Sequence, residues 1–74
     1  MTMKFTFDHS VQFRDGTSTQ PYRVIRWWKT ERGALKAAER HAIGMDKFYV
    51  PGTVAQHCLR IWDDQGRFVT NMAA

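Results

Sequence analysis

Apolar and polar residues alternate from Met3 to Phe13, near the start of the chain. A period of two predicts a strand with one buried face, because successive side chains of a strand point to opposite sides of the sheet. The pattern also allows an interruption between Asp8 and Ser10. The pair Asp15-Gly16 is typical of a tight hairpin turn, so we expect the chain to reverse there.

Residues Tyr22 to Trp28 form the second predicted strand, since they are rich in aromatic and β-branched side chains. Their alternation slips between Val24 and Ile25, where two apolar residues are adjacent. The slip predicts either a β-bulge or burial of this strand on both sides.

The segment from Thr30 to Gly44 has helical periodicity. Thr30 is expected to cap the first turn through its hydroxyl, and Gly44 to end the helix in a left-handed conformation. The apolar stripe is mostly alanine, which predicts a helix that lies close against a sheet. The stripe consists of Ala34, Leu35, Ala38 and Ala42.

After the helix, the connection from Met45 to Gly52 contains several apolar residues and is expected to pack over an edge of the core, with a docking patch as the alternative. Residues Val54 to Trp62 then alternate as a strand with two unlike faces. The segment from Asp63 to Gly66 predicts a tight turn, and Arg67 to Met72 a last strand.

The predicted order is strand, strand, helix, strand, strand, in one domain spanning residues 1–74. Two antiparallel hairpins that flank one helix predict an α+β fold (ββαββ), a four-stranded antiparallel sheet with one helix packed across it. One helix covers only one side of such a sheet, so we expect the other face to be open or covered by a partner.

The chain carries a formal net charge of +4 and a single cysteine. A positive net charge favours binding to polyanions or to acidic protein surfaces. A single cysteine excludes an intramolecular disulfide. The N-terminal residues contain no long apolar run, which predicts neither a signal peptide nor a membrane span. We therefore expect a cytoplasmic protein.

Residue spacing argues against catalysis, metal binding and cofactors. Asp63 and Asp64 are adjacent in a predicted turn, and His57 and Cys58 are neighbours in a strand, which places their side chains on opposite faces. His9 and His41 stay open as partners for the cysteine. No Gly-rich phosphate loop or paired metal-ligand spacing occurs, and His57 is expected to be a hydrogen-bonded core or edge residue.

Two groups of side chains are candidates for partner binding. The first is a basic ridge along the helix, for which a merely solvated face is the alternative: Lys29, Arg32, Lys36 and Arg40. The second is Arg60 with Trp62, which should face away from the helix and suit either a nucleic-acid stacking platform or a protein hot spot. In the alternative, Trp62 only fills a gap against Trp27 or Trp28 in a cross-strand pair.

From Thr30 to Met72 the chain resembles the small phage-encoded anti-CRISPR proteins that act on type I surveillance complexes. Three short segments carry the resemblance: the alanine-rich helix Ala34-Leu35-Lys36-Ala37-Ala38, the strand entry Gly52-Thr53-Val54, and the hairpin segment Asp64-Gln65-Gly66-Arg67-Phe68-Val69. The resemblance implies a stoichiometric inhibitor, in the cytoplasm of a bacterial host, that docks on Cas backbone subunits where nucleic acid should bind. It fixes no contact residues.

We therefore expect a non-enzymatic binding protein that inhibits a type I CRISPR-Cas surveillance complex by surface contact. Two alternatives remain at this stage. One is a small nucleic-acid-binding protein or transcriptional accessory that uses the basic ridge directly. The other is a phage or toxin-antitoxin interaction module that forms a homodimer through its open sheet, so the protein is expected to be a monomer or a homodimer.

Overall fold

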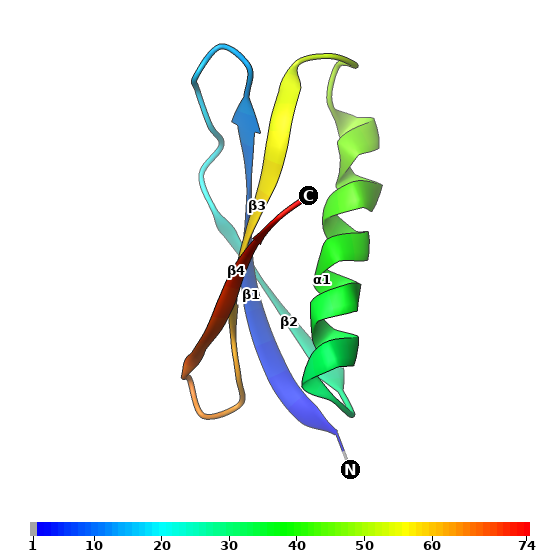
Figure 1. The fold of residues 1–74 in the computed structure, drawn as a ribbon, viewed down its shortest axis with the longest axis vertical. Coiled ribbons are helices and arrows are strands. Elements are labelled where there is room, and N and C mark those ends of the chain that lie inside the picture. Colours follow the sequence, from blue (N-terminus) through cyan, green and yellow to red (C-terminus); the bar gives the residue numbers. More distant parts are fainter. Residues whose placement is uncertain (1) are drawn as a thin grey trace.

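The computed structural model describes residues 2–74 and confirms the predicted ββαββ order (Figure 1). Four strands and one long helix follow one another along the chain. Their bounds are β1 (Met3–Phe13), β2 (Tyr22–Trp28), α1 (Glu31–Met45), a short 3-10 helix η1 (Asp46–Phe48), β3 (Val54–Trp62) and β4 (Phe68–Ala73). Among the described residues, no helix is both long enough and apolar enough to cross a membrane.

The sheet is antiparallel throughout, with strand order β2-β1-β3-β4. β1 is continuous, so the interruption considered between Asp8 and Ser10 is wrong. Asp8 is instead paired on both sides, with Arg23 of β2 and with Arg60 of β3. Pairing on both sides satisfies the backbone of this polar segment and keeps it in the sheet.

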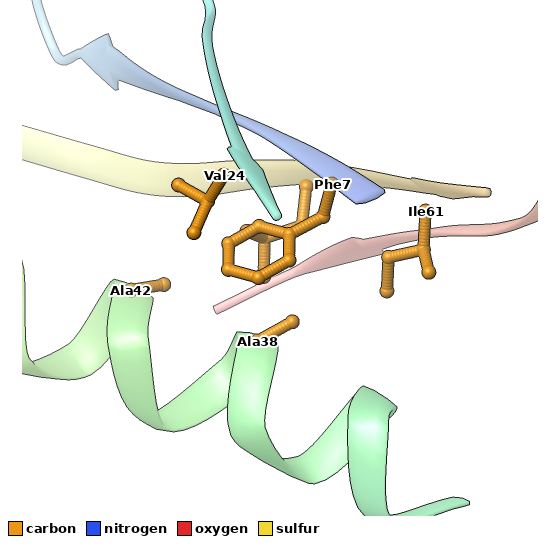
Figure 2. Packing of buried hydrophobic residues seen from close by; sticks show 6 residues of the cluster. Phe7, Val24, Ala38, Ala42 and Ile61 are labelled. Atoms are coloured by element: carbon orange, nitrogen blue, oxygen red, sulfur yellow. The ribbon is translucent and has the colours of Figure 1, made fainter. Parts of the chain in front are cut away.

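Helix α1 crosses one face of the sheet, and the core lies between them (Figures 1 and 2). The buried side chains come from alternate positions of the strands and from every fourth residue of the helix, as the sequence predicts. This cluster contains Phe7, Val24, Ala38, Ala42, Leu59 and Ile61, with Leu35, Val69 and Met72 packed against it. Because alanine methyl groups are small, large side chains of the sheet fill the space beneath the helix.

The helix begins as predicted and ends differently. The Thr30 hydroxyl accepts a hydrogen bond from the Gly33 backbone N–H at 3.0 Å, which is the expected N-terminal cap. The prediction that Gly44 ends the helix is wrong, since α1 continues through it and leads directly into η1. The Asp46 N–H bonds to the Ile43 carbonyl, so the chain leaves the helix through a tighter turn without a left-handed residue.

Neither explanation of the slip in β2 is correct. The strand pairs with β1 in unbroken register from Met3 opposite Trp28 to His9 opposite Tyr22, so it has no bulge. Val24 is buried against the helix, whereas Ile25 is 49% exposed on the open face. The adjacent apolar residues therefore mark one buried position and one open-face position of an edge strand.

In the connection between α1 and β3, one aromatic side chain packs against the sheet and other apolar side chains are exposed. The Tyr49 ring is half-buried and packs edge-on against Phe13, with ring centroids 5.7 Å apart. Phe48 and Val50 are 68% and 69% exposed. The packing prediction thus holds for Tyr49, while Phe48 and Val50 remain on the surface.

Candidate functional site

The predicted site residues lie on two opposite sides of the molecule. Lys29, Arg32, Lys36 and Arg40 are all exposed, and none forms an ion pair with any residue among 2–74. On a helix of 3.6 residues per turn, positions 32, 36 and 40 lie opposite the buried alanines. Arg32 and Lys36 therefore face away from the sheet, and Arg40 lies beside them but also lines a groove between α1 and β2. The prediction that Lys29 belongs to the helix is wrong, since α1 begins at Glu31. Arg60 and Trp62 lie on the sheet face that α1 leaves open.

On the open face, Asp8 joins two arginines across three strands. The Asp8 carboxylate accepts a hydrogen bond from Arg60 Nη2 at 3.0 Å and lies 3.5 Å from Arg23 Nε. The strand register explains this arrangement, since Asp8 is the cross-strand partner of both residues. We call Asp8, Arg23, Arg60 and Trp62 the Arg–Trp cluster.

Both guanidinium groups of the cluster lie over the Trp62 ring. The Cζ atoms of Arg60 and Arg23 are 5.6 and 5.9 Å from the ring centroid, within the range of cation–π contacts. Phe68 of β4 packs edge-on against the same ring at 5.8 Å. These contacts hold Trp62 in place while leaving it partly exposed.

The alternative in which Trp62 pairs with Trp27 or Trp28 is wrong. Trp62 is opposite Thr6 on one side and Phe68 on the other. Trp28 points toward the helix side of β2, because it shares the parity of buried Val24. Trp27 is on the open face but two strands away, opposite Lys4.

Charges near the cluster are balanced. A shallow depression beside Trp62 is lined by two cations, Lys4 and Arg23, and by two carboxylates, Asp63 and Asp64. Within the cluster, Asp8 compensates part of the charge of its two arginines. The open face therefore offers aromatic and guanidinium groups without a strong positive potential.

An apolar margin extends from the cluster over the same face. Ile25 and Trp27 have the open-face parity of β2, and Phe68 lies opposite Trp62 because the register of β4 shifts there. The three side chains are 49%, 62% and 55% exposed. Aromatic side chains and arginine are enriched at the centres of protein interfaces. This combination of residue types is therefore typical of a protein-binding surface.

A chain of hydrogen-bonded side chains crosses the opposite, helix-covered face. His41 Nε2 lies 2.6 Å from the Tyr22 hydroxyl, and this hydroxyl lies 2.9 Å from His9 Nδ1. His9 Nε2 lies 2.8 Å from His57 Nδ1, and His57 Nε2 lies 3.0 Å from Asp46 Oδ1. We call these five residues the histidine chain.

With all three imidazoles neutral, one set of donors satisfies every contact of the histidine chain. The Asp46 carboxylate only accepts, so His57 Nε2 carries a proton and its Nδ1 accepts from His9 Nε2–H. His9 Nδ1 then accepts from the Tyr22 hydroxyl, whose oxygen accepts from His41 Nε2–H. The direction of the whole chain follows from the carboxylate at one end.

The surroundings of His9, His41 and Tyr22 favour the neutral forms of these three side chains. Burial lowers the pKa of His9 from 6.5 to about 4, with smaller contributions from the neighbouring His57 and His41. Burial also lowers the pKa of His41, and the Arg26 charge adds to this effect. The pKa of Tyr22 is raised, first by burial and then by Tyr49.

The sequence indicated the role of only one member of this chain. His57 is a hydrogen-bonded core residue, as predicted. A pair between Cys58 and either His9 or His41 is contradicted, because Cys58 is opposite Ser10 on the open face and both imidazoles lie on the helix side. For His9, the signal available in the sequence was its place among the apolar positions of the β1 alternation, where a polar ring needs hydrogen-bond partners.

Within residues 2–74, no group of three or more histidine, cysteine, aspartate or glutamate side chains has an arrangement that could hold a metal ion. Comparisons with protein-family models, with curated proteins and with solved structures found no match to this chain. The resemblance to anti-CRISPR proteins therefore stays a prediction that rests on short segments.

Proposed function

We propose that this protein is a non-enzymatic binding protein that docks on another protein through the open face of its sheet. The observation that carries the proposal is the Arg–Trp cluster, in which Trp62 is held under two guanidinium groups on a face that no part of the described chain covers. Tryptophan and arginine dominate the binding energy of protein interfaces when they are centrally placed and fixed.

Charge balance favours a protein over a nucleic acid as the occupant of this face. Nucleic-acid binding depends on cations that are free to neutralise phosphates. Arg23 and Arg60 share the Asp8 carboxylate, and their guanidinium groups lie over the ring on which a base would have to stack. A partner that approaches the apolar margin and forms hydrogen bonds to the guanidinium edges fits better.

The partner that we propose is a backbone subunit of a type I CRISPR-Cas surveillance complex, in the cytoplasm of a bacterial host. This choice rests on the resemblance of residues 30–72 to anti-CRISPR proteins. The inhibitor would occupy the surface on which target DNA is engaged, so that binding of the protein and binding of DNA exclude each other.

Binding to a purified, guide-loaded type I surveillance complex tests the proposal. We expect Trp62→Ala to weaken binding by about 30-fold or more, because truncation of an interface hot spot costs on the order of 2 kcal/mol or more. Lys47→Ala, an exposed change on η1, is the matched control and should bind as the wild type does. Biolayer interferometry measures both affinities.

Two results would contradict this proposal. Failure of the wild type to bind the complex would reject the CRISPR partner, and unchanged affinity of Trp62→Ala would reject the open face as the interface. Sedimentation of the free protein covers the remaining alternative. A wild-type dimer that Trp62→Ala converts to a monomer would show that a second copy of the chain occupies this face.

Direct nucleic-acid binding is the second candidate function, because the basic ridge has no ion-pair partner among residues 2–74. If the ridge binds duplex DNA, log affinity should fall with log salt with a slope on the order of −3 to −4, from about 0.9 per phosphate contacted. We expect weak or no binding by the isolated protein in a gel-shift assay. A tight and salt-dependent shift would favour this second function.

The matched variant for that assay carries Arg32→Glu, Lys36→Glu and Arg40→Glu together. Its melting temperature should stay within a few degrees of the wild type, because exposed charges contribute little to stability. A DNA complex that survives these changes would place the contact away from the ridge.

A further inference from the structure

A groove lies between α1 and the edge strand β2, on the helix side of the sheet and away from the Arg–Trp cluster. It combines an aromatic floor with positively charged walls. Its lining residues are Phe7, Arg26, Trp28, Ala37, Arg40 and His41. None of them is acidic.

The cations of the groove lack carboxylate partners. Neither Arg26 nor Arg40 forms an ion pair with any residue among 2–74. Arg26 Nη1 donates a hydrogen bond to the Ile25 carbonyl at 2.9 Å, which leaves its other N–H groups for a ligand. Two guanidinium groups beside one aromatic ring are an arrangement that suits a phosphate attached to a flat base.

His41 adds a third donor to this groove. Its Nε2 bonds to Tyr22, so Nδ1 is the ring nitrogen that remains free to take up a proton. In the free protein, burial and the Arg26 charge lower the pKa of His41. A phosphate in the groove would supply the negative charge that the surroundings of His41 lack, and would favour the imidazolium form.

Every described group that faces His41 is neutral or positive. From β2 these are the Tyr22 hydroxyl and Arg26; from β1 they are the rings of His9 and Phe7, with centroids 5.6 and 5.4 Å away. From α1 itself, Arg40 lines the same groove. A phosphate in the groove would add a negative charge that these neighbouring groups do not supply.

We propose that the groove between α1 and β2 binds the phosphate group of a nucleotide or of single-stranded nucleic acid, with Arg26, Arg40 and protonated His41 on the phosphate and Trp28 against the base. Binding takes up one proton at His41 Nδ1. The Nε2–H bond to Tyr22 stays in place, so the rest of the histidine chain keeps its order. This inference is independent of the protein-binding function proposed above.

Isothermal titration calorimetry with two probes, thymidine monophosphate and a short single-stranded oligothymidylate, tests the site and distinguishes the two sources of phosphate. The oligonucleotide diester carries no group that titrates near neutral pH, so its affinity should rise on going from pH 7.5 to pH 6 if His41 takes up a proton. The heat should also change with the ionisation enthalpy of the buffer. Binding of the monophosphate alone would identify a nucleotide site.

We expect Arg26→Gln to weaken binding of the oligothymidylate by about tenfold or more, because hydrogen bonds to charged groups are worth about 1.5–3 kcal/mol. His41→Gln should abolish the pH dependence and the buffer dependence. Arg32→Gln removes an equal charge from the helix outside the groove lining and is the matched control, with a change of less than about threefold expected from screened surface charge.

Three outcomes would overturn the proposal: no binding of either probe to the wild type, unchanged affinity in Arg26→Gln, or binding whose pH dependence survives in His41→Gln. Trp62→Ala separates this site from the open face. It should bind oligothymidylate as the wild type does, and a loss of binding in that variant would place the nucleic acid on the Arg–Trp cluster instead.

Discussion

Replacing Leu59 with alanine is expected to lower the free energy of unfolding by about 2–5 kcal/mol. Leu59 is 1% exposed and lies in the cluster beneath α1, so the change removes buried apolar atoms and leaves a cavity that small alanine side chains cannot fill. A domain of this size is stabilised by only about 5–15 kcal/mol in total. Urea denaturation followed by tryptophan fluorescence and by circular dichroism measures the loss.

Trp62→Ala is the matched control for this experiment, since Trp62 occupies the same strand but the opposite face. Because its ring is only partly buried, its removal should cost less stability than that of Leu59. A Trp62→Ala variant that unfolds beside a stable Leu59→Ala variant would contradict the placement of the core between α1 and the sheet.

Acidification is expected to destabilise the fold by about 3 kcal/mol through His9 alone between pH 6.5 and about pH 4. His9 is 0% exposed, and its pKa is lowered to about 4 by burial and then by its histidine neighbours. In this pH range the unfolded chain binds a proton at His9 and the folded chain does not. Stability therefore falls as the pH falls, and His41, whose pKa is lowered too, adds in the same direction.

Two measurements check this pH dependence. Denaturation midpoints at a series of pH values give the slope, which should be smaller in His9→Asn, a variant without the titrating group. In the folded protein, the NMR signals of the His9 ring should remain those of a neutral imidazole until the pH approaches 4. A folded-state transition of His9 near pH 6.5 would contradict the burial that the structure shows.

The fold was largely predictable because its signals are local. Alternation in β1 and β3, the alanine spacing in α1 and the turn residues near Gly16 and Gly66 each specify an element from neighbouring residues alone. The predictions were wrong where one residue type occurs in two structural environments. Gly44 has the composition of a helix end but lies within a helix, and Ile25 has the composition of a core residue but lies on the open face.

The open-face cluster was predictable in part. Alternation along β3 places Arg60 and Trp62 on one face, which the structure confirms. Asp8 and Arg23 were missed because their contact with Arg60 depends on the register of three strands. Register between strands distant in sequence cannot be read from alternation, since any shift by two residues preserves the same pattern.

The histidine chain was the feature least accessible from the sequence. Its five members come from β1, β2, β3, α1 and η1, and sequence separations reach 48 residues between His9 and His57. Each one, taken alone, is a polar residue at an ordinary position. Only the packing of the helix on the sheet brings them within hydrogen-bonding distance.

The spacing of the buried alanines has a consequence for the alignment of α1 on the sheet. Ala34, Ala38 and Ala42 present identical methyl groups four residues apart, so a displacement of α1 along its axis by about 6 Å, with a small rotation, would bring one methyl to the place of the next. Apolar burial distinguishes such positions weakly. His41 and Asp46, however, meet Tyr22 and His57 in only one of them. In this small domain, the apolar core thus supplies stability, whereas the hydrogen bonds of His41 and Asp46 select one position of the helix.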